Sequence, residues 1–196
     1  MIPETPVPTA QTRCPWCLSH PLYIRYHDTE WGVPQHDDRR LFEMLILEGA
    51  QAGLSWLTIL KRREEYEKAY FHWDIERIAR FDDTDRKRLL LDSGIIRNRS
   101  KVEASIRNAQ CFLNVCEEFG SFDTYLWRFT ENRVLCASPR FQRVQDLPCV
   151  SAESQRLSKD LQKRGFRFVG PTILYSYLQA CGLVDDHLQD CFKSNG

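Results

Sequence analysis

The chain has 196 residues, of which 42% are hydrophobic and 12% aromatic, and these proportions suit a globular protein with a substantial core. Its 27 basic and 27 acidic side chains cancel, which excludes binding to a polyanion through an overall positive charge, so any nucleic-acid-binding surface must be local. No apolar run approaches the roughly 18 residues of a membrane span, and no secretory signal opens the chain, so we expect a soluble cytoplasmic protein without membrane contact.

Two regions differ in composition along the chain. Residues 1–12 carry Pro3, Pro6 and Pro8 among polar residues and hold almost nothing large to bury, which predicts a disordered tail. From residue 13 to 196 helical signals dominate and strand alternation is scarce. We therefore predict an all-α fold with a single helical domain over 13–196, which could be divided into two helical lobes.

The predicted helices follow from capping residues and apolar spacing. Ser55 can start one helix, and Pro171 suits the first turn of another because that position needs no backbone donor. Residues 131–150 are predicted to form the longest irregular connection. The predicted helices span 39–51, 56–70, 74–81, 84–93, 100–119, 121–130, 151–164 and 169–182.

The first chemically distinctive segment, residues 23–34, is rich in aromatic side chains with polar tips, including Tyr23 and Tyr26. One interpretation is an aromatic patch that packs on the core. The other is a pocket wall for a nucleobase, because flat rings stack on the π faces of a base and hydrogen-bond to its polar edges. Trp16 and Trp56 can add further walls to such a pocket.

Glu48 lies on the helix predicted over 39–51, at a place that the pattern reserves for a hydrocarbon. An ionised carboxylate out of water needs a partner, or its pKa rises. One interpretation is that Glu48 is a structural acid whose partner is an arginine or a helix N-terminus. The other is that Glu48 is an acceptor at the rim of the aromatic slot. Leu54, in the following small-residue loop, is either a wedge that fills the gap left by a flipped base or a core leucine. The residues that share the face of Glu48 are Leu41, Met44, Leu45 and Ala52.

Residues 89–102 combine an apolar run, a turn at Gly94 and the alternating cations Arg97, Arg99 and Lys101 at the start of another helix. One interpretation is an ordinary corner between two helices with a solvated basic edge. The other is a helix-hairpin-helix, in which backbone N–H groups and the neighbouring cations hold a phosphate without reading sequence. A second positive face is expected from Lys163, Arg164 and Arg167.

His187 and Cys191 are four residues apart, which would place an imidazole and a thiolate on one helical face, a common geometry for two zinc ligands. The upstream ligands are either Cys14 with His27 or Cys14 with Cys17, and the site would tie the two ends of the chain together. The pair Cys14 and Cys17 is also spaced like a redox motif. The remaining cysteines are treated as small buried hydrophobic residues: Cys111, Cys116, Cys136, Cys149 and Cys181.

Taken in order, these motifs closely resemble the bacterial DNA-3-methyladenine glycosylase I family of the helix-hairpin-helix glycosylase superfamily, and the likeness runs from about residue 13 to 191. Any one motif would be unspecific, whereas the ordered set is highly specific. The matching positions are Cys14, Tyr23-x2-Tyr26-His27-Asp28-x-Glu30-Trp31-Gly-Val-Pro34, Leu47-Glu48-Gly49-x-Gln51-Ala-Gly-Leu-Ser-Trp56, Gly94-Ile-Ile-Arg97-x-Arg99-x-Lys101, Gly165-Phe-Arg-Phe-Val-Gly170 and His187-x3-Cys191.

The resemblance implies a helix-hairpin-helix glycosylase fold and a structural zinc ion that joins the N- and C-terminal segments. It implies a monomeric, monofunctional enzyme that flips 3-methyladenine out of alkylated double-stranded DNA, releases the free base and leaves an abasic site. Its metal ligands would be Cys14, His27, His187 and Cys191. The catalytic residue would be Glu48, and the base-binding residues Tyr26, Tyr23, Trp56 and Trp16. The DNA-binding residues would be Gly94, Arg97, Arg99, Ser100 and Lys101, with Leu54 as the wedge.

Three positions depart from the family pattern. Cys17 adds a thiol near the zinc site, Ala50 replaces a polar residue, and Ser100 stands where the hairpin can carry glycine. None of them removes a catalytic group, and the residue that guides the attacking water is not assigned. Two other classes of function compete with this one: a zinc-stabilised DNA-binding module without catalysis, and a thiol-disulfide protein that uses Cys14 and Cys17.

Overall fold

The structure, a computed structural model, describes residues 11–194. Most of the tail predicted over 1–12 lies outside the described residues. Its last residues, however, contact the body of the protein, because the Phe192 N–H donates to the Thr12 carbonyl over 2.9 Å. Within 11–194, no helix has both the length and the hydropathy that crossing a bilayer requires.

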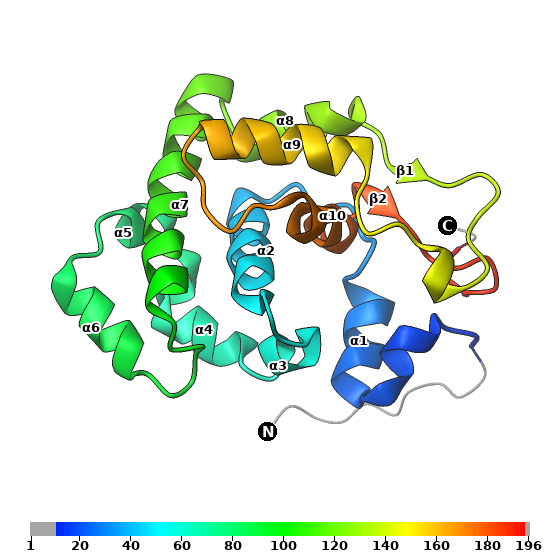
Figure 1. The fold of residues 1–196 in the computed structure, drawn as a ribbon, viewed down its shortest axis with the longest axis horizontal. Coiled ribbons are helices and arrows are strands. Elements are labelled where there is room, and N and C mark those ends of the chain that lie inside the picture. The colour runs from blue at the N-terminus through cyan, green and yellow to red at the C-terminus, as the bar shows by residue number, and fades with distance from the viewer. Residues whose placement is uncertain (1–10, 195–196) are drawn as a thin grey trace.

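The prediction of a mostly helical protein is confirmed (Figure 1). The only strands in the described part are β1 and β2, which pair in parallel through two residues each. The α-helices are α1 Pro21–Thr29, α2 Asp38–Gln51, α3 Trp56–Leu60, α4 Arg63–Ala69, α5 Ile75–Ala79, α6 Asp83–Leu91, α7 Arg99–Phe119, α8 Phe122–Trp127, α9 Ala152–Lys163 and α10 Pro171–Ala180. Short 3₁₀ turns are η1 Pro15–Ser19, η2 Phe71–Trp73, η3 Arg128–Thr130 and η4 Val144–Asp146, and the strands are β1 Leu135–Cys136 and β2 Val184–Asp185.

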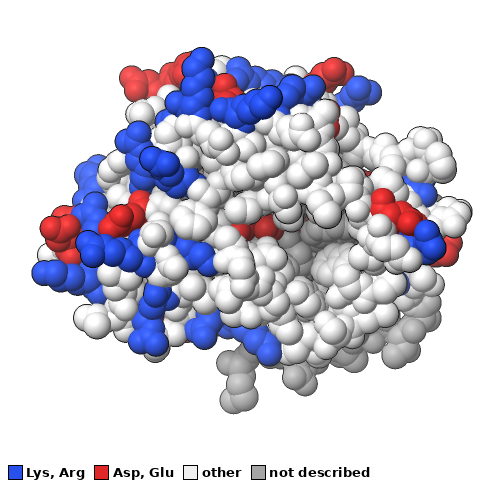
Figure 2. Space-filling model, viewed as in Figure 1, with Lys and Arg blue, Asp and Glu red and all other residues white. Residues whose placement is uncertain are grey.

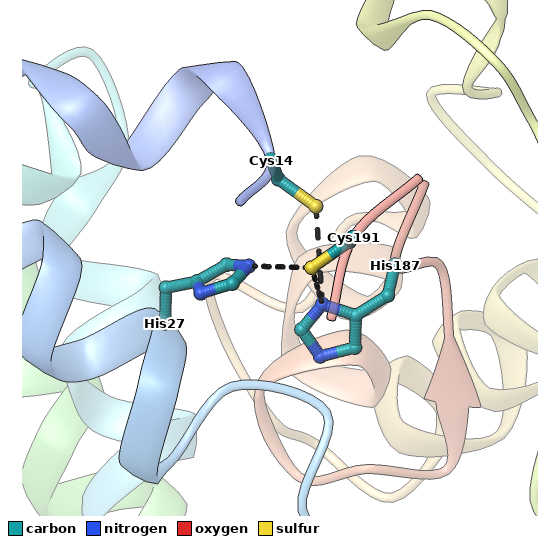
Figure 3. A group of neighbouring side chains, drawn as sticks. All are labelled: Cys14, His27, His187 and Cys191. Carbon is teal, nitrogen blue, oxygen red and sulfur yellow. Dashed lines mark hydrogen bonds between the residues drawn. The ribbon is translucent and has the colours of Figure 1, made fainter. Parts of the chain in front are cut away.

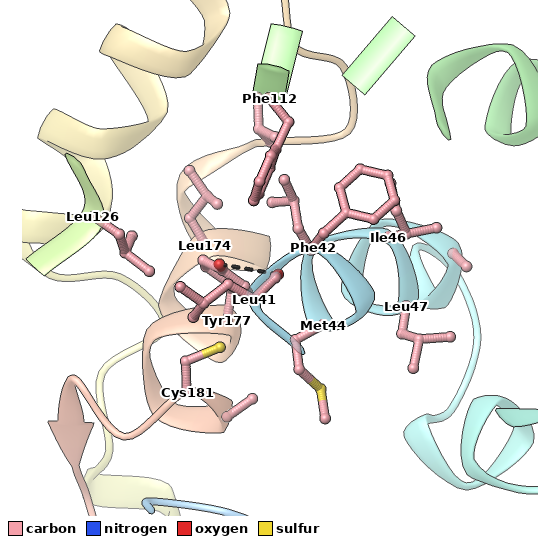
Figure 4. Packing of buried hydrophobic residues seen from close by; sticks show 14 of the residues in the cluster. Leu41, Phe42, Met44, Ile46, Leu47, Phe112, Leu126, Leu174, Tyr177 and Cys181 are labelled. Carbon is pink, nitrogen blue, oxygen red and sulfur yellow. Dashed lines mark hydrogen bonds between the residues drawn. The ribbon is translucent and has the colours of Figure 1, made fainter. Parts of the chain in front are cut away.

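Helix α2 lies at the centre of the molecule (Figure 1). It begins at the side chain of Asp37, which accepts the Arg40 N–H, and every residue from 41 to 50 is buried. Burial therefore extends beyond the face that Glu48 shares with Leu41, Met44 and Leu45. Figure 4 shows its side chains beside Phe112 of α7 and Tyr177 of α10, whose hydroxyl donates to the Leu41 carbonyl over 3.1 Å. A side chain on such a helix is held in a fixed place.

Two helical segments differ from the prediction. The helix expected over 56–70 is broken near Arg62, so that α3 and α4 are separate. No helix is predicted over 21–29, but α1 forms there because His20 accepts the Leu22 N–H and Pro21 occupies the first turn. The aromatic residues of 23–29 therefore project from a helix.

The C-terminal segment also differs from the prediction. Residues 186–191 form a loop that ends in a turn and not a helix, so His187 and Cys191 are brought together by a bend in which the Cys191 N–H donates to the Leu188 carbonyl. Of the five cysteines predicted to be buried, Cys111 and Cys181 are buried, Cys116 is half-buried, and Cys136 and Cys149 are exposed between α8 and α9.

Candidate active site

A pocket of about 200 Å³ opens beside the centre of α2. It brings together elements that are distant in sequence: η1, α1, α2, α3, α10 and the connection before α9. The five residues predicted to contact a base all line it, so the alternative of an aromatic patch without a pocket is wrong. The lining residues are Trp16, Tyr23, Tyr26, Trp31, Glu48, Gln51, Trp56, Leu147, Ser176 and Gln179.

The aromatic walls of the pocket brace one another. Trp16 meets Tyr23 edge-on with ring centroids 5.7 Å apart, and Tyr26 lies 5.5 Å from Trp56. The Tyr23 hydroxyl accepts the Leu57 N–H over 2.9 Å, which ties α1 to α3. Such paired rings give the pocket a flat, π-rich and polar-edged lining, which suits a purine.

Glu48 supplies the only carboxylate of this lining. It is 4% exposed, and its side chain forms no hydrogen bond or ion pair with any residue from 11 to 194. Burial raises the pKa of Glu48 to about 8. The interpretation of Glu48 as a structural acid paired with an arginine or a helix end is therefore wrong. Glu48 thus lines the pocket as a buried carboxylate without a partner among the described residues.

The raised pKa predicts how stability depends on pH. The folded protein holds the Glu48 proton more tightly than the unfolded chain does, so protonation of Glu48 stabilises the fold. This stabilisation is fully present below the ordinary carboxyl pKa and is lost as pH rises through about 8. Between the ordinary carboxyl pKa and about pH 8, the free energy of unfolding of wild type should fall by up to about 1.4 kcal/mol per pH unit relative to that of Glu48→Gln. Urea unfolding of both proteins from about pH 5 to pH 8 measures the difference. Parallel stability curves would show that Glu48 does not titrate as the structure requires.

A second cluster lies next to the pocket and consists of Cys14, His27, His187 and Cys191 (Figure 3). All four are buried, and their possible ligand atoms lie within 4.8 Å of one another. The Cys191 sulfur is 3.4 Å from His27 Nε2 and 3.5 Å from His187 Nδ1, and the Cys14 sulfur is 3.8 Å from the same Nδ1. Bonds of about 2.0–2.3 Å in a tetrahedron separate neighbouring ligands by roughly 3.3–3.8 Å, so this cluster could hold a metal ion.

The surroundings of the cluster also fit a metal site. His27 Nδ1 lies 2.8 Å from an Asp28 oxygen, and His187 Nε2 lies 3.3 Å from the Trp31 carbonyl oxygen, as is usual for metal-bound imidazoles. Burial lowers the pKa of His187 to about 4, which keeps its ring neutral and available as a ligand. Cys17 lies outside the cluster and donates to the Cys14 carbonyl over 3.1 Å. The arrangement therefore favours His27 over Cys17 as the fourth metal ligand.

The cluster of Cys14, His27, His187 and Cys191 shares a wall with the pocket. The Trp31 ring lies 4.6 Å from the His187 ring and 5.0 Å from the Trp16 ring, and Trp16 lies 5.5 Å from His27. Ordering of the cluster would therefore fix the orientation of the aromatic rings that line the pocket.

Helices α6 and α7 and the turn between them form the predicted hairpin region. Gly94 is needed there because a Cβ at this position would lie 2.7 Å from the Cβ of Glu65. Arg97, Arg99 and Ser100 are exposed, and Arg99 pairs with Glu103 on the next turn of α7. These residues stand at the surface, as a backbone contact requires.

Lys101 is predicted to be a surface cation of the hairpin, but its side chain is turned toward α2. Its ammonium group donates to the carbonyls of Ala50 and Ala52 over 2.8 and 2.7 Å, and burial lowers its pKa. It thus satisfies carbonyls at the C-terminal end of α2, where a cation is favoured. Leu54, in the turn that Lys101 holds, is 40% exposed, which is inconsistent with the alternative of a core leucine.

Sequence reasoning missed part of the pocket lining. Trp31 belongs to the aromatic segment over 23–34 but is not predicted to line the pocket. Gln179 is predicted only as part of the helix over 169–182. The Gln179 amide is fixed by Asp186, which accepts its Nε2 over 2.6 Å. Leu147 comes from the irregular connection, whose path no local pattern predicts. The other missed residues are Gln51 and Ser176.

A helical scaffold that carries an aromatic pocket with one unpaired buried acid defines a class: helical proteins with a binding site for a flat, polar-edged ligand such as a purine. Three comparisons identify the branch of that class. The family described as methyladenine glycosylase matches residues 16–194. The DNA-3-methyladenine glycosylase 1 of Escherichia coli (strain K12) is 45% identical over 179 residues, which cover 91% of this chain and 95% of the relative.

Two solved structures agree with this result. A crystal structure of 3-methyladenine DNA glycosylase I is similar with a TM-score of 0.88 and 47% identity, covering 92% of this chain and 98% of the other. A variant of 3-methyladenine DNA glycosylase I in complex with 3-methyladenine gives a TM-score of 0.88 at 38% identity, covering 92% and 96%. The chain belongs to the methyladenine glycosylase family.

Proposed function

We infer that this protein is a hydrolytic DNA glycosylase that excises 3-methyladenine from alkylated DNA in base-excision repair. The relatives named above carry this activity in their names, and one of the similar structures holds 3-methyladenine. The observation that carries the inference here is Glu48, a buried carboxylate without a partner that lines an aromatic pocket.

The chemistry of the lesion explains this pocket. Methylation at N3 makes adenine cationic, so the base is already a good leaving group and strong acid catalysis is unnecessary. The flipped cationic ring stacks between the aromatic walls, where cation–π attraction favours the methylated form. Glu48 accepts hydrogen bonds from the exocyclic amine and the adjacent ring edge. The nearby positive charge lowers the Glu48 pKa, so the carboxylate ionises against the lesion. Water then attacks the sugar C1′ and an abasic site remains.

The metal proposed for the cluster of Cys14, His27, His187 and Cys191 is zinc. Two thiolates and two imidazoles form a common tetrahedral set for structural zinc, in which no position stays open for substrate. A zinc ion held by these four residues would be structural and would take no part in bond cleavage. The four residues would then fasten the C-terminal turns to the N-terminal segment and hold Trp31 beside the pocket.

The proposed DNA-binding element is a helix-hairpin-helix formed by α6, the turn through Gly94 and the start of α7. Its exposed position and its cations Arg97 and Arg99 support contacts to a phosphate backbone that do not depend on sequence. Leu54 supports a wedge because it is apolar, exposed and close to the pocket residue Trp56.

The double variant Arg97→Ala and Arg99→Ala should weaken binding to every duplex and leave binding of free 3-methyladenine unchanged. Loss of two phosphate contacts should reduce the slope of log affinity against log salt by about 2. Fluorescence titrations of methylated and unmethylated duplexes at several salt concentrations measure this slope. A loss confined to one base sequence, or an unchanged slope, would argue against the backbone role.

A further inference from the structure

A groove of about 460 Å³ lies beside the hairpin region and is distinct from the aromatic pocket. One side is the first turns of α7, and the other is the loop over 164–170 that connects α9 to α10. Its lining residues are Ser100, Glu103, Ala104, Arg107, Arg167 and Phe168. The loop carries the family-like pattern from Gly165 to Gly170, but the pocket, the Cys/His cluster and the hairpin do not use it.

The loop is held rigidly in a strained conformation. Phe168 has φ +54°, a left-handed value that is uncommon for a residue other than glycine. Asn108 of α7 is 3% exposed and binds both sides of Arg167, donating to its carbonyl over 2.9 Å and accepting its N–H over 2.8 Å. The Ser158 hydroxyl donates to the Val169 carbonyl over 2.7 Å. Strain that buried polar groups maintain is typical of functional segments.

The groove carries two arginines that no carboxylate neutralises. Within residues 11–194, neither Arg107 nor Arg167 forms an ion pair, and both are exposed. By contrast, Arg164 pairs with both Glu118 and Asp160. The prediction of a second positive face is therefore wrong for Arg164, whose charge is already neutralised. The one acid in the groove, Glu103, is engaged by Arg99. The groove therefore offers a net positive charge to an anion.

Gly165 makes room for one of these guanidinium groups. A Cβ at this position would lie 2.6 Å from Arg107 Nη2, and the residue has φ +95°. Arg107 Nε also donates to the Gly165 carbonyl over 3.4 Å. The glycine thus lets the Arg107 guanidinium pack against the loop.

The groove is continuous with the predicted DNA-binding surface. Ser100 belongs to both the groove and the start of the hairpin's second helix, and Lys101 joins that helix to the turn that carries Leu54. The Phe168 Cβ lies 3.3 Å from the position of a Cβ at Gly49, the residue after Glu48. Figure 2 shows that Lys and Arg side chains gather on the left of this face, on the side of α6 and α7.

We propose that this groove is a second phosphate-binding site, which holds the DNA backbone beyond the hairpin contact. Arg107 and Arg167 bind the phosphate oxygens, and the ring of Phe168 forms an apolar wall for the adjoining deoxyribose. This inference rests on the proposed function, because it needs duplex DNA as the substrate. Arginine suits the site since its planar fork matches two phosphate oxygens.

The test compares duplex binding by wild type with binding by the double variant Arg107→Gln and Arg167→Gln. With an unmethylated duplex no base is released, so affinity alone is measured across a range of salt concentrations. We expect an affinity lower by about tenfold at moderate salt, and a salt slope reduced by about 2 for the two lost contacts. Phe168→Asn keeps a residue that tolerates the left-handed conformation but removes the ring, and it should weaken binding without changing the slope.

Two controls keep the outcomes separate. Arg39→Gln removes an exposed arginine at the opposite end of α2 from Glu48 and should bind duplex like wild type. Free 3-methyladenine should bind equally to all variants, which shows that their pockets are folded. A wild-type slope in the double variant would overturn the second phosphate site. If wild type itself neither binds duplex nor releases base, the proposed function has failed instead.

Discussion

Glu48→Gln is expected to fold normally and to excise 3-methyladenine from methylated duplex at least about tenfold more slowly than wild type, because a charged hydrogen bond contributes about 1.5–3 kcal/mol. Glutamine keeps the volume of the side chain but cannot supply the negative charge that complements the cationic base. No partner among the described residues loses a contact, since the Glu48 carboxylate has none. Single-turnover release of labelled base, followed by chromatography, measures the effect.

Glu43→Gln is the matched control for this prediction. Glu43 is also a buried glutamate of α2, but its carboxylate binds Arg40 and Arg63, each over 2.7 Å. Its substitution leaves the largely buried Arg63 with a weaker partner, so it should lower stability while the folded protein keeps its excision rate. Wild-type excision by Glu48→Gln would remove Glu48 from the proposed mechanism, whatever the behaviour of Glu43→Gln.

His187→Ala is expected to release the metal ion and to lower the free energy of unfolding by on the order of 5 kcal/mol, because binding energy at a structural metal site is folding energy. The loss should be largest in the C-terminal turns and at Trp31, whose ring contacts His187. Elemental analysis and thermal unfolding measure the two effects. Native protein without zinc would contradict the assignment of the metal.

Cys17→Ser serves as the control for metal binding. Cys17 is as buried as Cys14 and only three residues away, but its sulfur lies outside the ligand cluster and donates to a backbone carbonyl. The variant should therefore keep its full metal content. Loss of metal in Cys17→Ser would favour the ligand set in which Cys17 replaces His27.

The sequence predicted best those elements whose signals are local. Most helices were expected because their caps and apolar spacing are strong, as at Ser55 and Pro171, which begin α3 and α10. Helix α1 was missed since its cap is a histidine, which is not a usual capping residue. The paired positions of His187 and Cys191 were predicted correctly for the wrong reason, because a bend and not a helix brings them together.

Features that depend on tertiary contacts could not be predicted from the chain. The apolar spacing around Glu48 identified one face of α2, and nothing local revealed that every residue from 41 to 50 is buried. Lys101 looked like an exposed cation, but its partners are carbonyls about 50 residues earlier in the chain. Gln179 and Leu147 join the pocket only because α10 and the irregular connection pack beside α2. The character of the site was predictable from Glu48 and its aromatic neighbours, whereas its full lining was not.

The most direct measurement is to incubate the purified, metal-replete protein with methylated duplex DNA and to identify any liberated base by chromatography. The account predicts that free 3-methyladenine appears and that an abasic site remains in the strand. A protein that binds the duplex but releases no base would be a zinc-stabilised DNA-binding module, and that result would contradict the proposed enzyme.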